Sequence, residues 1–74
     1  MLRVKLFRGS QRLFDAAARE VVLPSESGEV SVLDFHAPML CVIEKGDVRI
    51  DGTVFSVRNG IARVDRNIVT ILAH

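Results

Sequence analysis

Apolar and polar residues alternate along most of the chain with the two-residue period of β-strands. Residues 2–7 alternate leucine or valine with mainly charged neighbours, which predicts a strand with one dry face and one wet face. A turn at 8–10 leads to two further predicted strands, at 11–14 and 18–23. The alanines at 16–18 are the only helix-favouring stretch, and they are too few to form a helix without support.

Residues 23–40 read as two polar loops around one short strand. Pro24 and Pro38 bound this stretch, and because proline cannot donate to a sheet ladder we expect a change of chain direction at each. Between them, Val30 and Val32 alternate with other residues at strand spacing. Polar loops on both sides of so short a strand are typical of a contact surface rather than a core.

Two dipeptides in the second half predict two-residue hairpins. Asp51-Gly52 and Asn59-Gly60 suit turns in which both central residues have positive φ. The strand pairs predicted from these turns are Ile50 with Thr53, Val48 with Phe55, Val57 with Ala62, and Phe55 with Val64. Both turns lead to one shared apolar face, and a third turn at 65–67 is expected to return residues 68–72 alongside.

The frequent turn signals predict an all-β fold, a small antiparallel β-sandwich or flattened barrel of about nine to ten short strands. At 74 residues the chain allows one domain, covering residues 1–74. Almost half of its residues are apolar, and its only aromatic residues are four phenylalanines, so we expect an aliphatic core. Val54 and Ile61 fall on the predicted outward face, which implies a partner that covers them.

Several separated segments carry a family resemblance. They read Gly28-Glu29-Val30-Ser31-Val32-Leu33, His36-Ala37-Pro38-Met39-Leu40, Gly46-Asp47-Val48-Arg49-Ile50, Phe55-Ser56-Val57-Arg58-Asn59-Gly60 and Val69-Thr70-Ile71-Leu72-Ala73. In this order they resemble the amino-terminal domain of the epsilon subunit of bacterial F-type ATP synthases. The resemblance covers essentially the whole chain.

The chain departs from the family pattern at three places. Ser31 stands where the family commonly has glycine, and Asp34-Phe35 stands where it has Pro-Gly before the histidine. The family's Ser-Gly-Gly is here Arg58-Asn59-Gly60. We expect Asn59 to keep its turn, because asparagine tolerates a left-handed conformation.

The resemblance implies a non-catalytic subunit of the central stalk, which binds the gamma subunit and the membrane rotor c-ring and couples ion translocation to ATP synthesis. It also implies that the Gly-Glu loop and the His-Ala-Pro loop meet these partners at one end of the sandwich. The partner-binding residues expected on this basis are Gly28, Glu29, His36, Ala37 and Pro38. The expected location is peripheral, at the cytoplasmic face of the inner (plasma) membrane, with no cofactor.

Many family members continue into a helical hairpin that can extend along gamma and inhibit ATP hydrolysis, and in some members it binds ATP. This sequence ends at His74, where that hairpin would start. We therefore expect a chain that binds gamma but neither binds ATP nor inhibits hydrolysis by extension.

Charge and cysteine content bear on the remaining function classes. Ten basic and nine acidic residues leave a net charge of +1, so nucleic acid is not an expected partner. Cys41 is the only cysteine, which excludes an internal disulfide and suits a buried position in a reducing compartment. Arg49, Arg58 and Arg63 lack an accompanying phosphate loop or stacking aromatics, so we expect them to be solvated or to face a subunit.

His36 is the one candidate for chemistry, because Asp34 and Glu29 lie near it in the sequence. A zinc site needs several protein ligands, and the only other histidine is His74, so no metal is expected. An acid–base site would need a cleft and a second group with an opposed pKa. Two alternatives stay open: a sandwich adaptor outside the synthase, and a small metal-binding or hydrolase domain built on His36.

Overall fold

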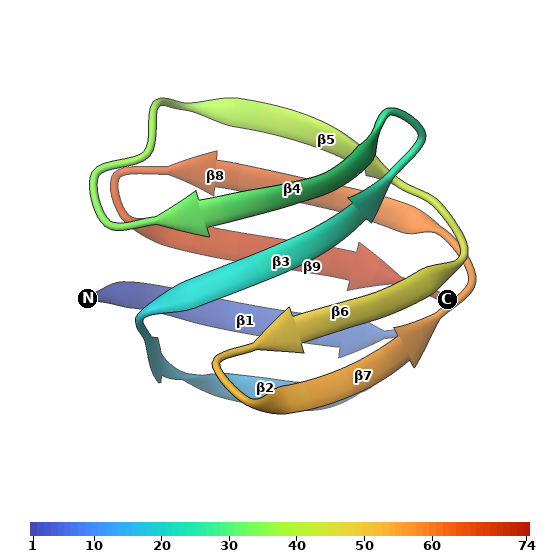
Figure 1. Ribbon diagram of the computed structural model, residues 1–74. Helices are drawn as coiled ribbons and strands as arrows, with labels where there is room; N and C mark the ends of the chain where they lie inside the picture. Colours follow the sequence, from blue (N-terminus) through green and yellow to red (C-terminus); the bar gives the residue numbers. More distant parts are fainter.

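The computed structural model describes Met1–His74 and consists of strands joined by turns and short loops (Figure 1). The nine strands are β1 (Leu2–Arg8), β2 (Gln11–Ala18), β3 (Glu20–Ser25), β4 (Gly28–Leu33), β5 (Met39–Ile43), β6 (Gly46–Ile50), β7 (Thr53–Val57), β8 (Gly60–Asp65) and β9 (Ile68–Ala73). The all-β prediction is confirmed. No helix long and apolar enough to cross a membrane is present.

The strands form one curled sheet in the order β2-β1-β9-β8-β5-β3-β6-β7, with β4 paired to β3. β3 and β5 share a single bridge, Ser25 with Ile43, so the sheet folds over at this point and makes two layers. One pairing, between β1 and β9, is parallel, and the others are antiparallel. The parallel pair arises because the first and last strands of the chain lie side by side.

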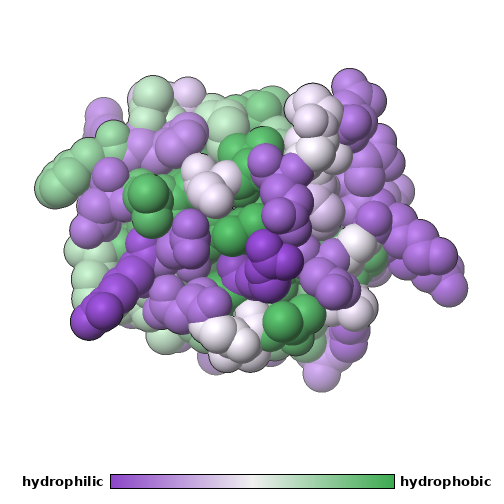
Figure 2. All heavy atoms as spheres, in the orientation of Figure 1, coloured by the Kyte–Doolittle hydropathy of each residue, from purple (hydrophilic) through white to green (hydrophobic).

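The core between the layers is aliphatic, as expected. Leucine, isoleucine, valine and alanine side chains make up almost all of a 17-residue cluster. No polar or charged residue is buried. Cys41 belongs to this cluster, which confirms its expected burial. The outer face seen in Figure 2 is mainly hydrophilic, with separate apolar areas between the polar residues.

The first predicted hairpin is confirmed. β6 and β7 pair Ile50 with Thr53 and Val48 with Phe55. Asp51 has the positive φ of 53° that the turn requires, whereas Gly52 does not. The Asp51 Oδ1 also accepts the backbone N–H groups of Arg19 and Glu20, at 3.0 and 3.1 Å, so the turn is tied to the start of β3.

The second predicted hairpin is wrong, because β7 does not pair with β8. Instead, β8 pairs with β5 and β9, and the chain crosses between layers at Arg58-Asn59. There the Arg58 N–H donates to the His74 carbonyl at 2.7 Å, and the His74 N–H donates to the Asn59 carbonyl at 2.8 Å. Neither Asn59 nor Gly60 has positive φ. Gly60 is required instead by close packing, since a Cβ there would overlap the Leu72 carbonyl oxygen.

Three smaller expectations are also corrected. β2 runs through the alanines to Ala18, because these residues pair with the first residues of β1. Pro24 lies within β3 and does not turn the chain: proline lacks only the donor, and its carbonyl accepts the Glu44 N–H at 2.9 Å. Val54 and Ile61 do not share a face, because their strands lie in different layers. The third turn is confirmed, with positive φ at Arg66 and Asn67.

Candidate partner-binding surfaces

The predicted contact residues lie at two ends of the molecule. Gly28 and Glu29 begin β4, whereas His36, Ala37 and Pro38 follow its far end. Figure 1 shows the β3–β4 turn and the β4–β5 connection on opposite sides of the sandwich. At about 3.3 Å per residue, the strand from Glu29 to its last residue spans about 13 Å. The expectation that both loops share one end is therefore wrong, because an extended strand separates them.

Glu29 is exposed and makes one ion pair. Its Oε2 lies 3.1 Å from the Arg49 Nη1, between two exposed side chains. The adjacent Gly28 has a φ of 113°, and its carbonyl accepts the Ser25 hydroxyl at 2.6 Å, which closes the β3–β4 turn. An exposed pair of this kind contributes about 0.2–1 kcal/mol. Glu29 can therefore exchange Arg49 for a partner's group at small cost.

His36 is partly buried and bonded to its own loop. Its Nδ1 lies 2.7 Å from the Ala37 carbonyl, and its backbone N–H donates to the Leu33 carbonyl at 3.2 Å. Since a carbonyl only accepts, Nδ1 carries the proton in this contact and Nε2 remains available. No group of three His, Cys, Asp or Glu side chains in the structure could hold a metal ion. The geometry thus gives His36 a role in shaping the loop.

The loop containing His36 is tied to the β8–β9 turn by Asn67, which sequence reasoning missed. The Asn67 Oδ1 accepts the Phe35 N–H at 2.7 Å, and its Nδ2 donates to the Asp34 Oδ1 at 3.1 Å. The Met1 amino group lies 3.3 Å from the same Asp34 oxygen, and the Arg3 N–H donates to the Asn67 carbonyl at 2.9 Å. We call Asn67 with its bonds to Asp34 and Phe35 the Asn67 clasp.

The clasp holds Phe35 in an unusual conformation. Phe35 has a φ of 62°, and 89% of the residue is exposed. The family pattern has glycine at this position, and glycine is the residue that adopts positive φ without strain. That departure was the sequence signal for this feature.

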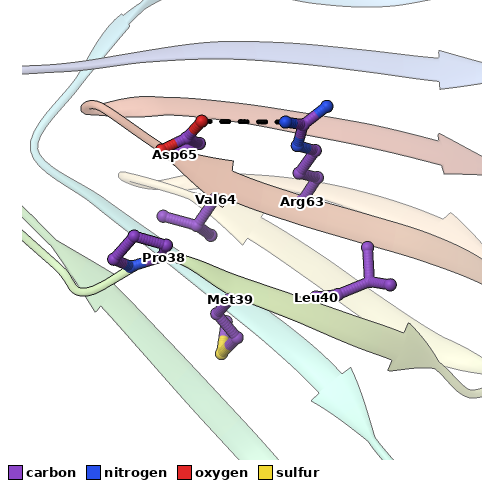
Figure 3. Close-up of a pocket in the computed structure, with 6 residues that line it drawn as sticks. All are labelled: Pro38, Met39, Leu40, Arg63, Val64 and Asp65. Carbon is purple, nitrogen blue, oxygen red and sulfur yellow. Dashed lines mark ion pairs between the residues drawn. The ribbon is translucent and has the colours of Figure 1, made fainter.

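A shallow hollow lies beside the same loop (Figure 3). Its volume is about 350 Å³, and it lies between Pro38, Met39 and Leu40 of the β5 side and Arg63, Val64 and Asp65 of β8. The Arg63 and Asp65 side chains extend on the same side of β8, with an ion pair at 3.7 Å.

The outer face of β5, β8 and β9 carries a row of exposed apolar residues. Val42 pairs with Ile61, and Ile61 pairs with Leu72, so the three lie side by side across three strands. All three are exposed. This apolar row lies in the opposite layer from Val54, and such a row is the kind of surface that a partner covers.

Together these features describe a small all-β domain, with polar loops at both ends and an exposed apolar row on one face. The chain belongs to the ATP synthase Delta/Epsilon chain β-sandwich domain family, whose family model matches residues 1–74. It is 33% identical over 78 residues to the ATP synthase epsilon chain of Thermosynechococcus vestitus, covering 100% of this chain and 56% of the relative. It is 37% identical over 76 residues to that of Gloeobacter violaceus, covering 97% and 58%. The chain therefore spans little more than half the length of these curated relatives.

Solved structures show the same fold at low sequence identity. A chain of the Euglena gracilis mitochondrial ATP synthase, in a structure of OSCP, F1 and the c-ring, superposes with a TM-score of 0.84 at 19% identity. The match covers 97% of this chain and 49% of that one. A chain of the Tetrahymena thermophila mitochondrial ATP synthase central stalk and c-ring gives 0.79 at 15%, covering 97% and 62%. The expected family is confirmed.

Proposed function

We propose that this chain is the β-sandwich of an epsilon-type subunit in the central stalk of an F-type ATP synthase. It binds the gamma subunit and the rotor c-ring, and it helps transmit rotation between ion translocation and ATP synthesis. It carries no catalytic residue and associates with the membrane only through the complex, on the cytoplasmic face. The observation that carries this proposal is the family match over residues 1–74, together with curated relatives named as epsilon chains.

The geometry supports two separate contacts in place of the single one expected. Gly28 and Glu29 offer an exposed carboxylate at one end, with only Arg49 as its ion-pair partner. His36, Ala37 and Pro38 offer a loop held by backbone bonds at the other end, beside the hollow of β5 and β8. Because the two ends lie on opposite sides of the sandwich, each would meet a different surface of the rotor.

The experiment uses the ATP synthase purified from the organism whose genome encodes this chain. Its epsilon subunit is removed, and the purified chain is added back. We expect the wild-type chain to rebind and to co-purify with gamma. The double variant Glu29→Lys with His36→Ala should keep its fold, because it loses one exposed ion pair and one hydrogen bond within the loop, about 1–2 kcal/mol together, but it should rebind more weakly. Glu26→Lys, an exposed change of the same charge in the neighbouring turn, is the matched control.

Two results would count against the proposal. Failure of the wild-type chain to co-purify with gamma would remove the synthase function and favour an adaptor outside the complex. Normal rebinding by the double variant would keep the function but remove these residues from its interfaces.

A further inference from the structure

Phe35 combines backbone strain with an exposed aromatic ring. Its φ of 62° lies in the left-handed region, where a bulky residue is a rare outlier. It is also the most exposed large apolar residue of the chain, at 89%. Strain of this kind persists only where surrounding structure enforces it, and it concentrates at functional positions.

The Asn67 clasp is what enforces the conformation. The Phe35 N–H donates to the Asn67 Oδ1 at 2.7 Å, and the Asn67 Nδ2 donates to the side chain of the preceding residue, Asp34. Asn67 has a positive φ of 61° itself, so two left-handed residues from separate loops support each other. The exposed Phe35 ring is left out of the hydrophobic core. The fold therefore fixes the position of the ring, although the ring adds nothing to the packing of the core.

The surroundings of the ring indicate what it would bind. Three segments meet at this end: the N-terminus, the loop after β4 and the β8–β9 turn. Each has an exposed apolar residue in it or next to it, namely Met1, Leu33 and Ile68. Arg66, next to Asn67, is exposed and has no ion pair, whereas Asp34 is already paired with the Met1 amino group. This end of the molecule thus presents an exposed aromatic ring, three further exposed apolar residues and one cation without an ion pair.

We propose that Phe35 is an aromatic anchor that inserts into an apolar socket with an acidic rim on a partner subunit of the rotary complex. This inference rests on the proposed function and assigns one of its contacts to a single side chain. Aromatic anchors that fill a pocket dominate the energy of protein interfaces. A lipid surface fits less well, because one ring and one free cation provide weak membrane binding.

The decisive variant is Phe35→Gly, because it separates an anchor from a structural residue by the sign of its effects. Glycine adopts the required φ without strain, so the urea midpoint should stay the same or rise. Affinity for a purified subcomplex of gamma and the c-ring should fall about thirtyfold or more. Val54→Ala, which truncates an exposed apolar side chain on β7 outside this end of the molecule, is the control and should retain more of the affinity.

Asn67 is a positioning residue in this proposal. Asn67→Gly keeps the left-handed turn but removes both side-chain bonds, so it should weaken binding by freeing the Phe35 loop. The double variant Phe35→Gly with Asn67→Gly should bind no more weakly than Phe35→Gly alone, because the clasp acts through the ring. Arg66→Gln should reduce the salt dependence of binding.

Four outcomes would overturn the proposal. If the wild-type chain binds the subcomplex and Phe35→Gly binds it with the same affinity, Phe35 is not an anchor, while the proposed function stands. A lowered urea midpoint in that variant would make Phe35 a structural residue. Equal binding of the wild-type chain to protein-free phosphatidylcholine–phosphatidylglycerol vesicles would assign the tip to lipid. Absence of any wild-type binding to the subcomplex would overturn the proposed function as well.

Discussion

Replacing Gly60 with alanine tests the crossing of the chain between the two layers. A Cβ at this position would overlap the Leu72 carbonyl oxygen and lie 2.7 Å from the Ala73 Cα. Both obstacles are backbone atoms of β9, so no side chain can rotate away. Gly60 also pairs with Ile43 and Ala73, which means that a shift of β8 disturbs both of its neighbours.

The expected cost follows from these contacts. Overpacking costs about 1–3 kcal/mol, and each weakened ladder hydrogen bond adds about 1 kcal/mol. We therefore expect Gly60→Ala to lower the free energy of unfolding by about 2–4 kcal/mol. A domain of this size has a total stability of only about 4–11 kcal/mol, so much of it would be lost.

The measurement is urea unfolding followed by far-ultraviolet circular dichroism, since the chain has no tryptophan or tyrosine. Gly52→Ala is the matched control: nothing lies within 4 Å of its added Cβ, and its φ is not positive. It should change stability by less than about 1 kcal/mol. Gly60→Asn should be as harmful as Gly60→Ala. Tolerance of asparagine would show a left-handed turn at Gly60 and refute the close-packing explanation.

Four further predictions concern the core, the free sheet edges, Phe55 and the thiol. Ile71→Ala should cost about 2–5 kcal/mol, whereas its exposed neighbour Leu72→Ala should cost under about 1 kcal/mol; similar costs in urea unfolding would contradict the register of β9. The rings of Phe14 on β2 and Phe55 on β7 meet edge-to-face, with their centroids 6.1 Å apart. A double-mutant cycle that replaces each with leucine should therefore give a coupling energy of about 0.5–1.5 kcal/mol. Because Phe55 is only half-buried, Phe55→Ala should cost less than a fully buried phenylalanine would. Burial raises the pKa of the Cys41 thiol, so the unfolded chain loses this proton first and stability should fall as the pH rises above about 8.5; Cys41→Ala should remove that part of the slope.

The alternation of residue types determined which side chains face the core. Val57, Ala62 and Val64 are buried as predicted, although the hairpin used to place them does not exist. The prediction survived because side chains alternate between the two faces of any strand, whichever strand lies beside it. The Asp51 turn was also readable, because it joins neighbouring strands through the conformation of two residues.

Strand partners and the contact loops were decided by the tertiary structure. A glycine needed for positive φ and a glycine needed for close packing are the same letter in a sequence, so Gly60 was assigned to a turn instead of to its contact with β9. The strained Phe35 depends on Asn67, 32 residues further along the chain. Local sequence patterns cannot predict such pairings. The pairings form only when the two layers pack together and bring backbone groups that are distant in the sequence within hydrogen-bonding distance.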